Sequence, residues 1–365
     1  MSDALQQARS LFLEGNGHFT EDRLPQALAC FEAAAALAPG RPSVLANLGV
    51  TQSLLGRWHD AIPNLQASTR DDPAQPDAWL ALGRCLGRLG DAPAALEAFE
   101  RALACDPTLA EAWSARGGLL RDAGRLAQAA VCFERALALG ADDGLHRFYL
   151  ASVQGGAAPP QPPRDYVEAL FDQYAGEFEQ HLVQGLQYRA HEILLQPLMD
   201  GPRRFAHVLD LGCGTGLCGR LIHGRALSLD GVDLSLAMVQ QARATGVYRD
   251  VVHGDLLAFL QATDETADLV IAADVFIYVG ALEAVFAAVR RRLRAGASFA
   301  FSVELSAGEE DLRLLPSLRY AHAPAYVQRL AAEHGFRMQQ QWQAPIRHDQ
   351  GIAVPGLYVV LEPTD

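Results

Sequence analysis

Small and large apolar residues in the first 150 positions recur with a period of 34, spaced within each period as on two amphipathic helices. The small residue of the first helix recurs at Gly15, Gly49, Gly83 and Gly117, and the large residue of the second at Phe31, Leu65, Phe99 and Phe133. Prolines at 39, 73 and 107 end each second helix, because proline cannot continue one. The pattern predicts four helix pairs over about residues 8–141.

After residue 164 the pattern changes to short apolar runs that alternate with amphipathic stretches. The short runs predict seven strands, at 207–210, 227–232, 248–253, 267–273, 297–303, 336–342 and 357–361. Helices are predicted at 165–185, 186–199, 217–223, 236–245, 281–294 and 324–333. This alternation indicates an α/β Rossmann-like domain with a mostly parallel sheet covered on both faces. No helix separates the last two strands, so we expect them to form a terminal antiparallel hairpin.

The two patterns are separated by residues 155–163, where four of the last five residues are proline. Such a segment favours an extended, semi-rigid spacer. The sequence therefore predicts an all-helical repeat domain over 1–154, a linker over 155–163 and an α/β domain over 164–365. A chain of 365 residues is long enough to bury two such cores.

The charge and cysteine content exclude several classes of function. The net charge is −13, which argues against broad binding of nucleic acid or anionic membranes. The chain has no lysine, so neither a lysine Schiff base nor a lysine general base is available. Six cysteines without a C-x-x-C spacing indicate reduced thiols in a cytoplasmic protein, with no zinc framework and no metal site expected. No apolar run is long enough to span a membrane, and no signal peptide is evident.

The most informative motif is a glycine turn at 212–216 that directly follows the predicted strand ending at Asp210. A carboxylate, Asp233, follows the next strand. A glycine turn after one strand and a carboxylate after the next are typical of nucleoside sites in α/β folds. The spacing of Gly214, Gly216 and Gly219 also matches the dinucleotide signature, so a nicotinamide or flavin enzyme is the competing interpretation at this point.

The N-terminal periodicity resembles the tetratricopeptide repeat, with Trp79 and Trp113 in the repeat's aromatic slot. The first unit has Leu11 in that slot, and the fourth has Ala141 where the others have proline. The resemblance implies a superhelix whose groove binds a protein or peptide partner. A dimerisation or folding platform is the alternative, and nothing in the sequence indicates the oligomeric state.

Residues 205–362 resemble the class I S-adenosylmethionine-dependent methyltransferases. The resemblance rests on the glycine turn, on Asp233 with the helix after it, and on the segments 253–256, 268–274 and 293–302 in the expected order. The terminal hairpin fits this family better than a dehydrogenase. Segment 170–182 resembles the lid helix of many small-molecule members. The whole arrangement resembles bacterial predicted methyltransferases that contain tetratricopeptide repeats.

This resemblance implies S-adenosylmethionine as cofactor and assigns roles to individual residues. Gly212, Cys213, Gly214 and Gly216 are expected to bring the backbone close to the methionine and ribose parts. Asp210 is expected to orient the turn or face the ammonium group, with a strand-end cap as the alternative. Asp233 is expected to accept hydrogen bonds from the ribose hydroxyls, with a helix N-cap as the alternative.

The remaining predicted cofactor contacts lie on either side of these. Leu234 and Met238 are expected to flank the adenine, which Asp255 and the backbone of Leu256 are expected to bind. An N-cap role is the alternative for Asp255 as well. Tyr174, with Tyr188 and Arg189, is expected to cover the carboxylate end of the cofactor.

Methyl transfer is an in-line displacement and needs a base only if the acceptor must lose a proton. The candidates for such a base are His181, His322, Tyr278 and Glu304, each of which also has an ordinary structural interpretation. The segment after the fourth strand, 274–278, lacks the motif of adenine-methylating enzymes, which disfavours a base or amide acceptor. The sequence thus predicts an enzyme that methylates a small molecule or a protein recruited by the repeats. A repeat scaffold with a cofactor-binding but inactive second domain is the alternative.

Overall fold

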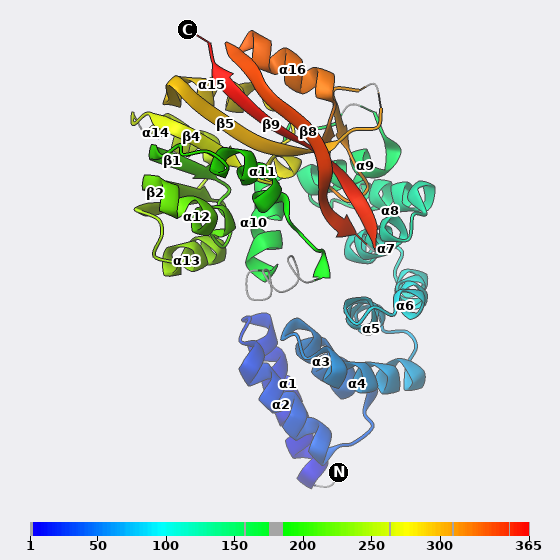
Figure 1. Ribbon diagram of the computed structural model, residues 1–365. Coiled ribbons are helices and arrows are strands. Elements are labelled where there is room, and N and C mark those ends of the chain that lie inside the picture. Colours follow the sequence, from blue (N-terminus) through cyan, green and yellow to red (C-terminus); the bar gives the residue numbers. More distant parts are fainter. Residues whose placement is uncertain are drawn as a thin grey trace. The chain divides into compact units, whose positions relative to one another are not determined.

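The computed structural model describes residues 3–156, 158–174, 185–262, 264–308, 310–349 and 351–364, with the side chains of 173 and 174 left out. The chain divides into two compact units, Met1–Gln154 and Gly155–Asp365. Figure 1 shows a purely helical first unit, coloured blue to cyan, and a second unit built around one sheet. Each unit is described by itself.

The first unit consists of helix pairs joined by short turns. Its elements are α1 (Asp3–Thr20), α2 (Leu24–Leu37), α3 (Pro42–Leu54), α4 (Trp58–Asp71), α5 (Pro76–Arg88), α6 (Ala92–Cys105), α7 (Ala110–Asp122), α8 (Leu126–Ala138) and α9 (Asp143–Gln154). The first eight form the four predicted pairs, and the repeat fold is confirmed.

The 34-residue period has a direct steric explanation. A Cβ atom at Gly15 would lie 2.6 Å from the Phe31 ring, and one at Gly83 would lie 2.5 Å from the Phe99 ring. Since real Cβ atoms do not approach other atoms so closely, each glycine allows the large residue 16 positions later to fill the space between the paired helices. The indole N–H of Trp79 donates to the carbonyl of Pro73 at 3.0 Å, which ties one repeat to the end of the one before.

The ninth helix, α9, lies outside the predicted repeats. Its Tyr149 ring packs 5.3 Å from the ring of Phe133, and a ring nitrogen of His146 lies 2.8 Å from the Ser114 hydroxyl. The helix therefore covers the last repeat, which otherwise has no successor to pack against.

The second unit contains a nine-stranded sheet. Its strands are β1 (Phe205–Leu211), β2 (Ala226–Asp233), β3 (Asp250–His253), β4 (Ala267–Ala272), β5 (Leu293–Leu305), β6 (Leu312–Leu314), β7 (Tyr320–His322), β8 (Phe336–Asp349) and β9 (Ile352–Pro363). Strands β3, β2, β1, β4 and β5 lie side by side in parallel, and β9 and β8 continue the sheet as an antiparallel hairpin. The predicted mostly parallel sheet and its terminal hairpin are confirmed.

Two short strands depart from the predicted seven. Strand β7 pairs in parallel with the last two residues of β5, at Glu304 and Leu305, and β6 pairs antiparallel with β7. The sequence analysis treats this segment as irregular, because three-residue strands are too short for a period-two pattern to be visible.

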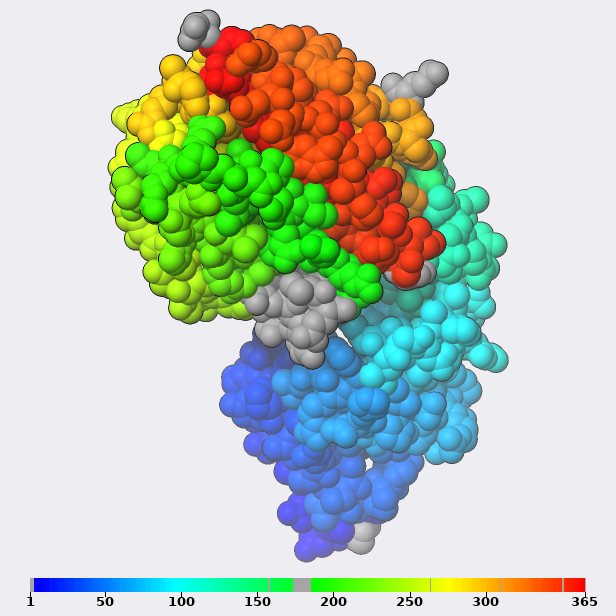
Figure 2. All heavy atoms as spheres, viewed as in Figure 1, coloured from blue at the N-terminus to red at the C-terminus, as the bar shows by residue number. Residues whose placement is uncertain are grey.

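Helices cover both faces of this sheet. They are α10 (Arg164–Tyr174), α11 (Ala190–Met199), α12 (Leu217–Ile222), α13 (Leu236–Ala244), α14 (Leu256–Ala262), α15 (Glu283–Arg292) and α16 (Pro324–Glu333). Along β5, Phe299 and Phe301 belong to a core with α15 and α16, whereas Ala300 between them belongs to a core with α11 and α12. This alternation places the two cores on opposite faces. Figure 2 shows α11, in green, beside the orange and red hairpin β8–β9.

The proline-rich segment is partly anchored to the second unit. The carbonyl of Pro160 accepts from the N–H of Ala281 at 2.9 Å, and that of Pro159 accepts from the Tyr320 hydroxyl at 2.8 Å. The predicted spacer is therefore held against the α/β unit at these two residues. Among the described residues, no helix combines the length and apolarity needed to cross a bilayer.

Candidate active site

A cavity of about 300 Å³ opens at the carboxyl ends of the parallel strands. One group of lining residues, the glycine half, comprises Gly212, Cys213, Gly214, Asp233, Leu234, Met238, Gly254, Asp255 and Leu256. A second group, the arginine half, comprises Tyr188, His191, Asp274, Ile277, Tyr278, Val279, Arg319 and Arg347. Sites in open α/β sheets lie at this edge, because loops after neighbouring strands diverge there.

The turn after β1 is possible only with glycine. Gly212 has φ +63°, and a Cβ atom there would lie 2.6 Å from Val275 Cγ2. Gly214 has φ +54°, and its missing side chain leaves open space beside the cavity. The turn thus exposes backbone that a ligand can approach closely.

Asp233 fastens this turn to the end of β2. Its Oδ2 accepts from the N–H of Gly214 at 2.8 Å, and its Oδ1 accepts from the N–H of Ser235 at 2.9 Å. The N-cap of α13 is Ser235, whose hydroxyl accepts from Met238, so the N-cap alternative for Asp233 does not apply. Burial raises the pKa of Asp233 against the opposing effect of these hydrogen bonds. Each carboxylate oxygen retains a further lone pair for a ligand hydroxyl.

The other predicted adenine contacts also line the cavity. Asp255 Oδ1 accepts from the N–H groups of Leu257 and Ala258, both at 2.9 Å. This carboxylate therefore caps the N-terminus of α14, which is the alternative interpretation of Asp255. Its second oxygen makes no hydrogen bond to another described residue. Met238 is buried at the cavity wall, and Leu234 is half-buried there.

Asp210 and Gly216 lie behind the cavity wall. Asp210 is 1% exposed and accepts from the Tyr248 hydroxyl at 2.7 Å. Burial raises its pKa to about 7. The Tyr248 ring also fills the space over Gly216 and Gly219, where a Cβ on Gly219 would lie 2.3 Å from the hydroxyl oxygen. The third glycine of the dinucleotide-like spacing therefore accommodates a tyrosine, and Asp210 supports the turn from below.

Helix α10 closes one side of the cavity with Val167, Leu170 and Phe171. It is attached to the glycine half, because Asp172 Oδ1 accepts from the Ser235 hydroxyl at 2.5 Å. The Tyr174 side chain and His181 lie outside the described residues, so their predicted roles stay predictions.

The arginine half is organised by a buried ionic cluster. Arg347 is 2% exposed, and its terminal nitrogens donate to Asp274 at 3.2 Å and to Glu304 Oε2 at 2.7 Å. Burial raises the pKa of both carboxyl groups, and Arg347 opposes that rise. Asp274 also has φ +58°, a left-handed conformation that non-glycine residues rarely adopt. Glu304 itself is not at the cavity surface, and it contributes through Arg347.

Tyr278 is the predicted base candidate that does line the cavity. Its hydroxyl accepts from Arg319 Nε at 3.2 Å, and its ring packs edge-on against Phe171, 5.1 Å between centroids. Arg319, on the turn between β6 and β7, lines the same part of the cavity.

Two predicted site residues lie elsewhere. His322 is fully buried, its Nε2 lies 2.7 Å from the carbonyl oxygen of Gly280, and burial lowers its pKa to about 4. It therefore serves the packing of β7 and does not reach the cavity. The Arg189 side chain is on the surface in an ion pair with Glu192, and the preceding residue, Tyr188, lines the cavity instead.

Comparisons with known proteins agree with this geometry. Residues 208–296 match a family model described as a methyltransferase domain, and residues 55–110 match one described as a tetratricopeptide repeat. Malonyl-[acyl-carrier protein] O-methyltransferase of Salmonella typhimurium is 33% identical over 199 residues, covering 53% of this chain and 74% of the relative. The chain belongs to the class I S-adenosylmethionine-dependent methyltransferases and carries N-terminal tetratricopeptide repeats.

Other similarities of this methyltransferase are shorter or weaker. Human methyltransferase-like protein 27 is 33% identical over 114 residues, covering 27% of this chain and 46% of the relative. The DhpI–S-adenosylhomocysteine complex aligns with a TM-score of 0.43 and 21% identity over 55% of this chain and 97% of its own. MamA aligns with a TM-score of 0.34 and 20% identity over 36% of this chain and 77% of its own.

The glycine half fits the family's cofactor, S-adenosylmethionine. The open space at Gly214 and the hydrogen-bonding capacity left on Asp233 and Asp255 suit a ribose and an adenine. The acidic character of this half also suits a cofactor with a sulfonium cation and no pyrophosphate. When bound, S-adenosylmethionine supplies an electrophilic methyl group.

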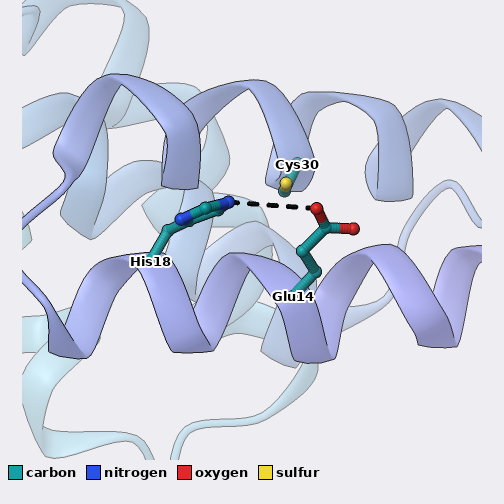
Figure 3. A group of neighbouring side chains, drawn as sticks. All are labelled: Glu14, His18 and Cys30. Carbon is teal, nitrogen blue, oxygen red and sulfur yellow. Dashed lines mark ion pairs between the residues drawn. The ribbon is translucent and has the colours of Figure 1, made fainter.

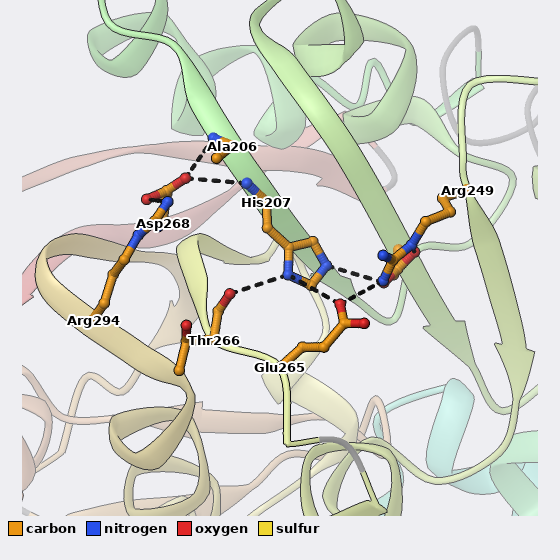
Figure 4. A network of polar contacts seen from close by, with 8 residues as sticks. Ala206, His207, Arg249, Glu265, Thr266, Asp268 and Arg294 are labelled. Carbon is orange, nitrogen blue, oxygen red and sulfur yellow. Dashed lines mark hydrogen bonds and ion pairs between the residues drawn. The ribbon is translucent and has the colours of Figure 1, made fainter.

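In the described part of this methyltransferase, side chains of types that can bind metal ions lie close together in two further places. Figure 3 shows Glu14 and His18 of α1 beside Cys30 of α2, and the Nδ1 of His18 already accepts from Arg23 Nε at 3.0 Å. Figure 4 shows His207 of β1 near Glu265 and Arg249, and both Asp230 and Glu265 are paired with Arg249. In each place an arginine of the chain already bonds at least one of the candidate ligand residues.

The residues that the sequence analysis missed are in the arginine half. Asp274, Arg319 and Arg347 come from three segments spread over 73 positions, and none forms a short motif. The only available signal is Asp274, the first polar residue after the buried run of β4.

Proposed function

We propose that this protein transfers the methyl group of S-adenosylmethionine to an acceptor bound in the arginine half of the cavity. The supporting observation is that one cavity joins a glycine turn suited to the cofactor with a second, ionic wall that contains Asp274, Arg319 and Arg347.

The wall residues support catalysis mainly by alignment and by exclusion of water. Val167, Leu170 and Phe171 of α10 shield the cavity on one side, and Ile277 and Val279 line it on the other. The cavity volume of about 300 Å³ favours a compact acceptor group over a folded protein surface. The name of the Salmonella relative makes malonyl-[acyl-carrier protein] one acceptor to test.

The test is transfer of labelled methyl from S-adenosylmethionine into an extract of the source organism. We expect wild-type protein to label an acceptor and Asp233→Ala to label it much less when the cofactor concentration is near the wild-type Kd. Cofactor binding without any transfer would favour the alternative, in which the second unit binds cofactor for a repeat scaffold. No binding at all would contradict both.

We also propose that the repeats recruit the acceptor or its carrier. The confirmed repeat fold supports this, because such arrays offer an extended surface for peptides and proteins. Removing residues 1–154 tests it, with cofactor affinity as the control that residues 155–365 remain folded. Equal labelling of the same acceptor by the shortened protein would contradict recruitment. The cytoplasmic location expected from the cysteine pattern stays a prediction.

A further inference from the structure

The two arginines at the cavity are bound very differently. Both terminal nitrogens of Arg347 donate to largely buried carboxylates, Nη1 to Asp274 and Nη2 to Glu304. Those of Arg319 make no hydrogen bond to another described residue, and the nearest carboxylate is Asp349, with Nη1 3.8 Å from its Oδ2. Arg319 therefore presents two terminal nitrogens that are still able to donate, whereas Arg347 uses both of its terminal nitrogens and has only its buried Nε without a partner among the described residues.

The Arg319 side chain is held in place. The turn that carries it is closed by the N–H of Leu315 donating to the Arg319 carbonyl at 2.9 Å, and Leu318 adopts φ +62° there. Its Nε donates to the Tyr278 hydroxyl, which is itself fixed by the ring of Phe171. Since Tyr278 accepts this bond through oxygen, its own O–H proton remains available to a ligand.

The local charges indicate which ligand fits. Asp274 and Glu304 are both paired with Arg347. The carboxylate nearest to Arg319, by contrast, is that of Asp349, which is half exposed and lies 3.8 Å from it. A bound cofactor also brings a positively charged sulfonium into this cavity, so a cationic acceptor would meet two positive charges, the sulfonium and the Arg319 guanidinium. An anionic acceptor can instead accept hydrogen bonds from the open terminal nitrogens of Arg319.

We propose that the methyl acceptor is a carboxylic acid, and that Arg319 and Tyr278 bind its carboxylate. This rests on the proposed methyl transfer. One carboxylate oxygen forms the new bond to the methyl carbon while the carbon–sulfur bond breaks, and the electron pair of that bond goes to sulfur. The products are a neutral methyl ester and S-adenosylhomocysteine. No proton is released, so this acceptor requires no base.

The chemical test uses the stability of the transferred label. Methyl esters release labelled methanol in mild alkali, whereas methyl groups on nitrogen, carbon or sulfur do not. We incubate the full-length protein with methyl-labelled S-adenosylmethionine and the extract, and then treat the product with alkali. Alkali-labile label supports the proposal. Alkali-stable label overturns it and leaves the proposed function intact, and no label despite cofactor binding overturns both.

The residue test compares two arginines of one hairpin. Arg319→Gln keeps the side-chain length and removes the charge, and we expect kcat/KM for the labelled acceptor to fall about tenfold to a hundredfold. The Kd for S-adenosylmethionine should change less than threefold. Arg313→Gln, an exposed position on β6, is the control and should behave as wild type. Arg319→Lys, which keeps the charge, should recover part of the loss. An unchanged kcat/KM in Arg319→Gln would overturn the assignment.

Discussion

The two halves of the cavity are built in different ways. The glycine half comes from residues 212–256, and its polar contacts are mostly between one carboxylate and nearby backbone N–H groups. The arginine half draws on residues 188–347 and is held by ion pairs between side chains far apart in sequence, such as Arg347 with Asp274. The first half is formed by residues close together in sequence. The second half forms only when the strands and turns that carry its residues have assembled into the sheet.

This difference implies different sensitivities. Removing a contact in the glycine half leaves the surrounding backbone hydrogen bonds in place, so the loss should appear in cofactor affinity. Removing Arg347 from the arginine half leaves two largely buried carboxylates without a counter-charge, so the loss should appear in stability. The predictions below separate these outcomes.

The largest effect is expected for Arg347→Met. The substitution keeps much of the side-chain volume and leaves Asp274 and Glu304 buried together without a counter-charge. We expect the free energy of unfolding to fall by about 3–5 kcal/mol, measured by denaturant titration. Arg347→Met combined with Asp274→Asn and Glu304→Gln should recover part of this. If the single variant is as stable as wild type, the ionic cluster does not hold the arginine half together.

A pH effect is expected from Asp210, beneath the glycine half. Its pKa is about 7 in the folded protein and 3.8 in the unfolded chain. Between these values the folded state binds more protons, so stability falls as pH rises through this window, and the loss is complete above pH 7. Asp210→Asn removes this dependence while keeping an acceptor for Tyr248. From pH 5 to 8 wild type should lose about 2–3 kcal/mol relative to the variant, measured without cofactor. Parallel stability curves for the two proteins would contradict this.

The same difference decides how much the sequence could predict. The 34-residue period and the glycine turn are visible because each depends on residues close in sequence or regularly spaced, such as Gly83 with Phe99. The arginine half has no such signal, because β6 and β7 are too short to show a pattern. Arg319 reaches the cavity from the turn between these two strands, which the sequence does not predict. His322, the predicted base candidate on β7, is fully buried like the other residues of that strand and contacts the carbonyl oxygen of Gly280, so it does not reach the cavity. Nor does the sequence show that Tyr248 lies beneath the turn and takes the hydrogen bond of Asp210.

In the glycine half itself, Asp233→Ala should weaken S-adenosylmethionine binding by about tenfold to a hundredfold, since a hydrogen bond to a charged group contributes about 1.5–3 kcal/mol. Calorimetric titration measures the Kd directly. Asp250→Ala is the matched control, because Asp250 begins the adjacent strand and does not line the cavity. An unchanged Kd in Asp233→Ala would remove Asp233 from the cofactor site.

The smallest change in stability is expected at Gly280, where the proline-rich segment packs beside the arginine half. Gly280 follows Tyr278 with φ +80°, and a Cβ atom there would lie 2.3 Å from the carbonyl oxygen of Pro160. Gly280→Ala should therefore lower stability by about 1–2 kcal/mol, through backbone strain and displacement of the docked proline segment. Gly224→Ala, where a Cβ meets no atom within 4 Å and φ is not positive, should have little effect in the same thermal unfolding assay. The Kd for S-adenosylmethionine should stay within twofold in both variants, because neither residue lines the glycine half. A large loss of cofactor affinity in Gly280→Ala would show that the two halves are mechanically linked, and the contrast drawn between them would fail.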